Sequence, residues 1–155
     1  VSVQASILNL LNALREENHN SLLFISHDIA VVGYVADWIA VIYMGRLMEV
    51  AYSADLFEPP YHPYTESLLS AVPLADPDAK QDRIRLTGEI PSSAQEMTGC
   101  PFHGRCPRHL GSVCDDEAPP WQTDDNAKSI FCHISIAELT AVQKRPFAFD
   151  QQVGS

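Results

Sequence analysis

The chain has 155 residues, of which 46% are hydrophobic and 19% are charged, and these values fit a single soluble domain. Ten basic and twenty acidic residues give a formal net charge of -10, which excludes a chain-wide basic surface for nucleic acid or for an anionic membrane. The longest apolar stretch, residues 29–44, is shorter than the roughly 20 residues that a membrane-spanning helix needs.

The first third of the chain predicts regular secondary structure, because no proline occurs before Pro59. Apolar residues at helical spacing between positions 7 and 14 predict a helix that ends near residue 18. Residues 21–26 (SLLFIS) form a short apolar run, which is typical of a strand buried on both faces of a parallel sheet. Asp28 is a suitable cap for a second helix that continues through Ala36.

Residues 38–51 predict a β-hairpin, because two segments rich in β-forming residues flank a turn at residues 45–46. Ser53 is predicted to cap a short helix that ends at Glu58, before two prolines. Residues 62–71 predict a further helix, with a proline in its first turn.

The second half of the chain is less regular. Residues 73–82 are rich in Asp and Pro and predict a linker. Beyond them only residues 130–142 show periodicity, which indicates an irregular strand followed by a helix. We expect the last ten residues to be loose.

Ser26, His27 and Asp28 directly follow the predicted buried strand. Such a position lies at the carboxyl edge of a sheet, where open α/β folds bind ligands. A ligand-binding role for His27 therefore competes with a surface role. For Ser26 and Asp28 the competing roles are a strand end and a helix cap.

All four cysteines lie in the last third of the chain, with the spacing C-x5-C-x7-C-x17-C: Cys100, Cys106, Cys114 and Cys132. The spacing lacks the C-x2-C pairs of a zinc ribbon. Disulfides and free structural thiols are open alternatives, but we favour a metal site. The segment has too little apolar periodicity to form a core, and a metal would supply folding free energy. Four thiolates suit tetrahedral zinc or one [4Fe-4S] cluster. Three histidines are alternative ligands: His103, His109 and His133.

Several strings resemble, in the family's order, the ATP-binding subunits of ABC transporters that import oligopeptides, dipeptides or nickel. Residues 22–50 resemble the segment with the switch histidine, its helix and the closing hairpin, and residues 1–11 resemble the helix after the D-loop. Residues 60–73, with PYHPYT, resemble the segment that marks this subfamily. Residues 88–107, with GEIPS and GCPFHGRCP, resemble its C-terminal extension. The resemblance covers about residues 1–135.

The resemblance implies an α/β fold in four parts. Residues 1–72 would be the C-terminal part of a P-loop NTPase domain of the ABC ATPase type, and residues 73–87 a linker. Residues 88–135 would be a small, irregular, Cys-rich metal-binding extension, followed by a C-terminal helix and tail at residues 136–155. Some members of the subfamily carry an iron-sulfur cluster in this extension, so we favour [4Fe-4S] over Zn2+.

The resemblance also implies roles for the first candidate site. His27 would contact the γ-phosphate of Mg2+-bound ATP and help hold the attacking water, while Ser26 and Asp28 support the loop. No GxxxxGK[ST] loop, LSGGQ-type signature or strand ending in Asp-Glu occurs, and the first residue is Val1. We therefore expect about the C-terminal half of a longer subunit, inactive alone, with residues 22–25 lacking neighbours on one face. The rival hypothesis is a non-enzymatic metal-binding regulatory or assembly module.

The family's architecture implies partners that this sequence does not itself encode. They are a second ATP-binding subunit in a homodimer or heterodimer, two membrane permease subunits and, indirectly, a solute-binding protein. The chain would then lie at the cytoplasmic face of the membrane, peripheral to it, without binding nucleic acid. The cargo stays open among dipeptides, oligopeptides, nickel and glutathione.

Overall fold

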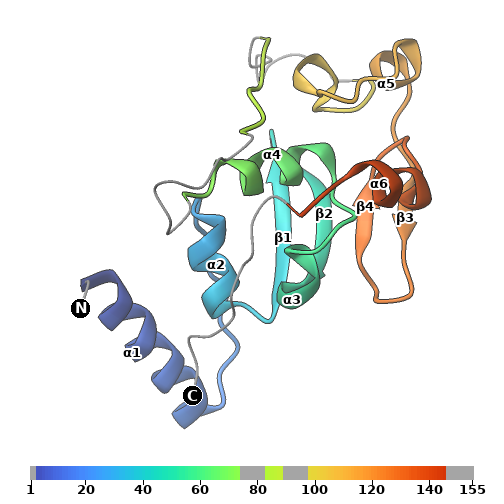
Figure 1. The fold of residues 1–155 in the computed structure, drawn as a ribbon. Helices are drawn as coiled ribbons and strands as arrows, with labels where there is room; N and C mark the ends of the chain where they lie inside the picture. Colours follow the sequence, from blue (N-terminus) through green and yellow to red (C-terminus); the bar gives the residue numbers. More distant parts are fainter. Residues whose placement is uncertain (1–2, 74–82, 89–97, 146–155) are drawn as a thin grey trace.

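The computed structural model of the protein describes residues 3–73, 83–88 and 98–145 (Figure 1). Its elements are α1 (Val3–Asn18), α2 (Ile29–Val35), β1 (Trp38–Tyr43), β2 (Arg46–Tyr52), α3 (Ser53–Leu56), α4 (Pro63–Ala71), η1 (His103–Arg105), α5 (Ser112–Asp116), β3 (Trp121–Thr123), β4 (Ser129–Phe131) and α6 (Ile136–Val142). This mixture of helices and sheet is consistent with the predicted α/β class. In the described ranges, no helix combines the length and apolar character needed to cross a bilayer.

The two N-terminal helices form as predicted. Helix α1 lies at the edge of the molecule, on the far side of α2 from the sheet (Figure 1). Side-chain contacts tie it to α2 and the residues after it: the Tyr34 hydroxyl donates to Asn9 Oδ1 at 2.9 Å, and Arg15 donates to the Val35 carbonyl oxygen at 3.4 Å and pairs with Asp37 at 3.2 Å. Helix α2 starts after Asp28, as its capping residue predicted.

The predicted strand at residues 21–26 is wrong for this structure. The segment forms no strand, and the side chains of Leu23 and Ile25 are 87% and 86% exposed. A strand needs a hydrogen-bonded neighbour, and none of the four strands in the described residues pairs with this segment. Within the described ranges, residues 21–26 therefore lack neighbouring strands, as expected, and without them the segment does not form a strand.

The hairpin is confirmed, with its turn one residue earlier than predicted. Strands β1 and β2 pair antiparallel, and Tyr43 lies opposite Arg46. The two residues between them, Met44 and Gly45, have φ of 47° and 76°. Positive φ at both positions is the geometry of a type I′ turn, which suits the twist of the strands.

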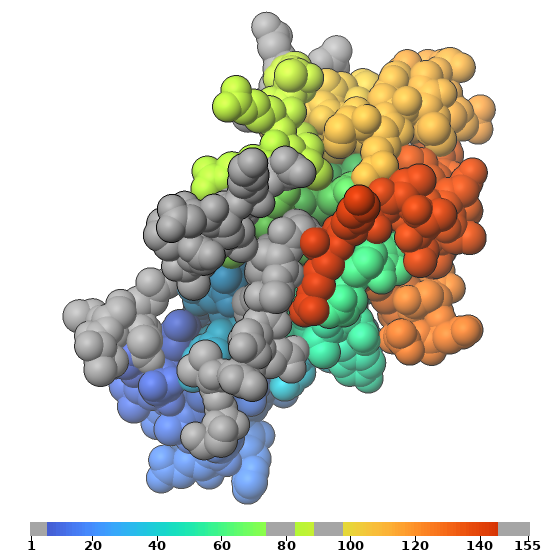
Figure 2. Space-filling model, in the orientation of Figure 1, coloured from blue at the N-terminus to red at the C-terminus, as the bar shows by residue number. Residues whose placement is uncertain are grey.

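The hairpin continues into a four-stranded sheet of order β1-β2-β4-β3. Strand β4 pairs antiparallel with β2, where Val50 lies opposite Ser129, and β3 pairs with β4. Residues on both sides of the predicted linker thus share one sheet. Below, residues 3–73 are called the N-terminal segment and residues 98–145 the C-terminal segment. In Figure 2 the atoms of the C-terminal segment (yellow to red) adjoin the green atoms of the N-terminal segment as one continuous surface.

Two helices flank the sheet as predicted, with one change at a cap. Helix α4 has His62 as its N-cap and Pro63 in its first turn. Helix α3 is shorter than predicted, and Ser53 is its first residue rather than its cap. The Ser53 hydroxyl instead donates to the Gly33 carbonyl oxygen at 2.9 Å, which ties α3 to α2. Helix α6 also forms, after a capping box between Ser135 and Glu138.

Three buried apolar clusters form the core. The first joins the hairpin to α3 and α4; its members are Ile39, Val41, Ala51, Leu56, Phe57, Tyr61 and Leu69. The second joins the tip of the hairpin to the cysteines; its members are Tyr43, Met48, Cys100, Phe102 and Cys114. The third lies under α6; its members are Ile130, Cys132 and Leu139. Most of the predicted linker and the C-terminal tail lie outside the described residues.

One face of the hairpin is apolar and exposed. Its cross-strand pairs are Trp38 with Tyr52, Ala40 with Val50 and Ile42 with Leu47. Trp38 is 46% exposed and Ile42 is 59% exposed. An exposed contiguous apolar surface of this kind is uncommon in a folded protein.

Candidate functional site

Residues 26–28 form an exposed bend directly before α2. The Ser26 hydroxyl accepts a hydrogen bond from the backbone N–H of Asp28 at 3.1 Å. The Asp28 carboxylate accepts from the N–H groups of Ala30 and Val31 at 3.1 and 3.2 Å. His27 is exposed, and no group in the described part of the chain hydrogen-bonds its ring. The two neighbours therefore fix the backbone around His27, and its imidazole stays open to an external ligand.

The four predicted metal ligands come from three short elements. Cys100 and Cys106 flank η1, Cys114 belongs to α5, and Cys132 follows β4. Cys106 is half-buried, and each of the other three is 7% exposed. The Cys100 N–H donates to the Cys114 carbonyl oxygen at 2.8 Å, which joins two of these elements. All four cysteines are free, so the disulfide alternative is wrong for this structure.

The structure does not support the predicted metal-ion site. Over residues 3–73, 83–88 and 98–145, no group of three His, Cys, Asp or Glu side chains is placed to hold a metal ion. The thiols instead pack in the apolar clusters, and burial raises the pKa of Cys106 to about 12 and that of Cys132 to about 11. Three of them are nonetheless neighbours, because Cys100 and Cys114 share one apolar cluster and Cys106 packs against it.

The three alternative histidine ligands have other partners. The His103 ring bonds the Cys100 carbonyl oxygen at 2.7 Å. The His109 ring lies 2.6 Å from Asp115 Oδ1, and the His133 ring lies 2.9 Å from the Glu117 carbonyl oxygen. These contacts hold the loops of the C-terminal segment and do not gather the rings around one point.

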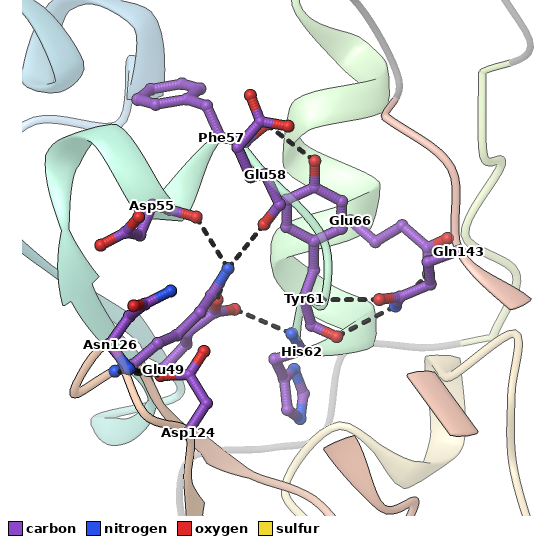
Figure 3. Close-up of polar contacts among 11 residues, drawn as sticks. Glu49, Asp55, Phe57, Glu58, Tyr61, His62, Glu66, Asp124, Asn126 and Gln143 are labelled. Atoms are coloured by element: carbon purple, nitrogen blue, oxygen red, sulfur yellow. Dashed lines mark hydrogen bonds and ion pairs between the residues drawn. The ribbon is translucent and has the colours of Figure 1, made fainter. Parts of the chain in front are cut away.

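A buried polar cluster that the sequence did not predict lies between the two segments (Figure 3). Lys128 is 2% exposed, and its ammonium group donates to the carbonyl oxygens of Asp55 and Glu58 at 2.9 and 2.7 Å. The ammonium also lies 3.5 Å from Glu49 Oε1 and 5.0 Å from the centre of the Tyr61 ring. Burial raises the pKa of Glu49 and lowers that of Lys128, while the ion pair opposes both shifts.

A second set of bonds joins the segments at α4. Arg108 donates to both carboxylate oxygens of Glu66, at 2.9 and 2.7 Å. The side-chain amide of Gln143 accepts from the Tyr61 N–H and donates to the Tyr61 carbonyl oxygen and to Glu66 (Figure 3). The carboxylate of Glu66 and the amide of Gln143 are therefore paired, which is the condition for burying polar groups without a large cost.

His62 is the third connection. Its ring Nδ1 accepts from the Tyr64 N–H at 3.0 Å, its backbone N–H donates to Glu49 Oε2 at 2.8 Å, and its ring hydrogen-bonds the backbone of Phe131. Burial lowers the pKa of His62 to about 3, so the ring is neutral at physiological pH. A glutamate inside the apolar string LMEVAY was the one sequence signal of this buried polar region.

Comparison with known proteins gives a consistent set of relatives. A family model described as oligopeptide/dipeptide transporter, C-terminal region, matches residues 48–114. The chain is 52% identical over 119 residues to a putative peptide import ATP-binding protein of Brucella ovis, covering 77% of this chain and 37% of that protein. It is 43% identical over 141 residues to a probable peptide ABC transporter ATP-binding protein of Sinorhizobium fredii, covering 91% and 40%. An oligopeptide transport ATP-binding protein of Bacillus subtilis is 40% identical over 136 residues, covering 86% and 41%. The chain thus spans about two fifths of the length of these relatives.

Proposed function

The chain belongs to the ATP-binding proteins of the oligopeptide/dipeptide ABC transporters, as a C-terminal part of one, and from this premise we propose that its full-length subunit hydrolyses ATP to drive peptide import. The observation that carries the proposal is the 52% identity over 119 residues to a protein named for peptide import and ATP binding. At that identity, the shared segment has the same fold.

The exposed apolar surfaces support this proposal. Leu23, Ile25 and the outer face of the hairpin are uncovered in a chain that spans about two fifths of its relatives. We assign their cover to the remaining three fifths of the subunit. Residues 21–26 then become a strand once that part supplies neighbours on both sides, as the sequence pattern of the segment indicates.

His27 is the residue proposed to act on ATP. Its ring is open to solvent, and Ser26 and Asp28 fix the backbone on either side of it. An imidazole at the end of a strand can hydrogen-bond the γ-phosphate and orient the attacking water, since phosphoryl transfer depends on positioning and charge stabilisation. ATP and its Mg2+ are held mainly by the part of the subunit outside this chain.

The experiment for this role is ATP hydrolysis by the full-length subunit. His27→Ala should lower kcat by about 100-fold or more, in the range of a lost positioned acid-base or charge-stabilising group. His19→Asn is the matched control: His19 is also exposed, and asparagine tolerates its φ of 52°. If His27→Ala hydrolyses ATP within twofold of the wild-type rate, His27 does not have this role. If both variants lose hydrolysis, the loss reflects impaired folding and not the chemistry of His27.

The domain division and the partners follow as proposals from the same premise. Residues 1–72 complete the ATPase domain, residues 73–87 link it to the extension at residues 88–135, and residues 136–155 form the last helix and tail. The subunit pairs with a second ATP-binding subunit and docks on two permease subunits at the cytoplasmic face of the membrane. A solute-binding protein delivers the peptide to the permeases.

For the four cysteines, the proposal is a [4Fe-4S] cluster rather than a single ion. The four ligands of one zinc ion lie about 3.8 Å apart, given a Zn–S distance of about 2.3 Å, and no group of three side chains in the described residues is placed to hold an ion. In a four-iron cluster each thiolate binds a different iron, so the sulfurs are neighbours at wider separation. The thiols of Cys100, Cys106 and Cys114, which pack together in one cluster, would be three of these four ligands, and Cys132 would be the fourth. When bound, the cluster would supply folding free energy to the C-terminal segment.

Iron and acid-labile sulfide in anaerobically purified full-length subunit test the cluster. About four iron atoms per chain with broad absorption near 400 nm are expected, and Cys106→Ser should remove most of both. His109→Ala is the control, because His109 is in the same loop region and contacts Asp115 instead. A colourless protein, or unchanged iron in Cys106→Ser, would contradict the proposal.

A further inference from the structure

We propose that Lys128 is a positioning residue for His27: from the C-terminal segment it holds α3, and through α3 it sets the helix α2 that follows His27. The inference rests on the proposed role of His27 in ATP hydrolysis. It assigns the C-terminal segment a function within the ATPase reaction, which neither the sequence motifs nor the relatives assign.

The first step is the cage around the ammonium group of Lys128. Its two short bonds go to carbonyl oxygens at and just beyond the end of α3, Asp55 at 2.9 Å and Glu58 at 2.7 Å. The Asp55 carbonyl oxygen also accepts from the Glu58 N–H at 3.1 Å, so the cation binds and fixes the turn that ends α3. Glu49, fully buried, balances the charge at 3.5 Å. A buried ammonium without these acceptors would be strongly disfavoured, so Lys128 and α3 hold one another in place.

The second step is the rigidity of the loop that carries Lys128. The Asp124 carboxylate accepts from the N–H groups of Asn126 and Lys128, both at 2.9 Å. The Asp124 N–H in turn donates to the Lys128 carbonyl oxygen at 2.9 Å. These bonds close the turn between β3 and β4, and β4 pairs with β2. The backbone of Lys128 is therefore fixed, and so is the position from which its side chain reaches α3.

The third step leads from α3 to α2. The first residue of α3, Ser53, donates its hydroxyl to the Gly33 carbonyl oxygen of α2 and its N–H to the Asp37 carbonyl oxygen just after α2, both at 2.9 Å. Ile29 and Val32 of α2 pack on the first apolar cluster, to which α3 contributes Leu56. Helix α2 thus rests on α3 through polar and apolar contacts. Its capping residue, Asp28, is the neighbour of His27.

The chain offers a matched control for this path. Arg108 also joins the C-terminal segment to the N-terminal segment through a cation, but its hydrogen bonds within the described residues go to Glu66 on α4 and not to α3. If Lys128 only fastens the two segments together, removing either cation has the same effect on α2. If Lys128 positions α2 through α3, only its removal loosens α2.

The experiment compares Lys128→Met and Arg108→Met in the full-length subunit by amide hydrogen exchange. The reporters are the amide of Val32 in α2 and that of Ala36, the residue that caps its C-terminus, which donate to the carbonyl oxygens of Asp28 and Val32 at 3.0 and 2.9 Å. Protection of these amides should fall about tenfold or more in Lys128→Met and stay within about twofold of the wild type in Arg108→Met. Equal loss in both variants, or no loss in Lys128→Met, would overturn the proposal.

A second variant and a second readout keep the test decisive. Ser53→Ala leaves the buried charge intact and cuts only the hydrogen bond to α2, so it should lower the same protection even where Lys128→Met does not fold. In ATP hydrolysis, Lys128→Met should lower kcat per folded subunit about tenfold with little change in the KM for ATP, and Lys128→Arg should restore part of it. Loosened α2 with unchanged kcat would overturn the positioning role. A wild-type subunit that hydrolyses no ATP would refute the proposed function instead. The hydrogen-exchange data do not depend on hydrolysis, so they would still test the connection between Lys128 and α2.

Discussion

Arg108 and Glu66 are 42 residues apart in the sequence, yet the guanidinium of Arg108 donates from Nε and Nη2 to both carboxylate oxygens of Glu66, at 2.9 and 2.7 Å. The Glu66 side chain is 8% exposed and that of Arg108 is 27% exposed. This two-bond pair is one of the contacts that make the C-terminal segment part of the same folded body as α4.

Removal of the guanidinium should destabilise the subunit. Arg108→Met leaves a buried carboxylate with Gln143 as its remaining partner, so the free energy of unfolding should fall by about 2–4 kcal/mol. Arg108→Lys should recover only part, because an ammonium cannot form the planar two-bond contact. Urea unfolding measures both, with Arg46→Met as the control at an exposed position. Equal stability of Arg108→Met and Arg46→Met would contradict the account.

His62 should make the fold sensitive to mild acid. Burial lowers the pKa of His62 from 6.5 to about 3. Between these values the unfolded chain binds a proton that the folded chain excludes, so stability is lost as pH falls through this range, by up to about 1.4 kcal/mol per unit. The raised pKa of Glu49 acts in the opposite direction, because the folded chain binds that proton more tightly, so the contribution of His62 is measured against a variant that keeps Glu49.

The comparison for His62 is His62→Asn, which retains a side-chain acceptor for the α4 cap. Unfolding free energies of both proteins between pH 7.5 and 5 should converge as pH falls, because only the wild type loses the histidine contribution. Parallel curves would mean that His62 protonates freely in the folded protein.

Gly99 should not tolerate a side chain, whereas Gly104 should tolerate one. A Cβ at Gly99 would collide with the carbonyl oxygens of Cys114 and Asp115, and a Cβ at Gly104 has nothing within 4 Å. Gly99→Ala should therefore cost about 1–3 kcal/mol by forcing α5 away, and Gly104→Ala less than about 0.5 kcal/mol. Because Cys100 and Cys114 move apart, iron content should also fall in Gly99→Ala alone. Equal iron content in the two variants would show that the close packing of Gly99 against α5 does not affect iron binding by the cysteines.

The exposed apolar segment at residues 21–26 should be covered in the full-length subunit. Ile25 is 86% exposed here and Leu110 is 52% exposed. A charge in a strand buried on both faces costs several kcal/mol, so Ile25→Asp should lower the unfolding free energy by about 3 kcal/mol or more. Leu110→Asp should change it by less than about 0.5 kcal/mol. If Ile25→Asp is as mild as Leu110→Asp, the remainder of the subunit does not cover this segment.

The elements that the sequence predicted correctly are those with local causes. Helix α1 follows from its apolar spacing, α2 from the Asp28 cap, and the hairpin from a turn with a glycine. Residues 21–26 have an equally clear pattern but need neighbours from outside the segment, so the local pattern alone did not produce a strand. The pairing of β2 with β4 joins residues about 80 positions apart, and no local pattern encodes it.

The candidate site divides in the same way. The Asp28 cap beside His27 was predictable, because capping involves residues two and three positions away. The burial of Lys128 was not, since lysine is almost never buried unless its charge is paired, and its acceptors are 70 and 73 positions away. For the cysteines, the sequence indicated their gathering, but spacing alone did not distinguish one ion from a larger cluster.

The most direct test of the central claim is peptide uptake by the assembled importer, reconstituted in proteoliposomes with ATP on the side of the ATP-binding subunits. The account predicts ATP-dependent accumulation of a labelled peptide that His27→Ala abolishes and His19→Asn leaves unchanged. Uptake that continues with His27→Ala, or an assembled complex that hydrolyses ATP without moving any peptide, would contradict it.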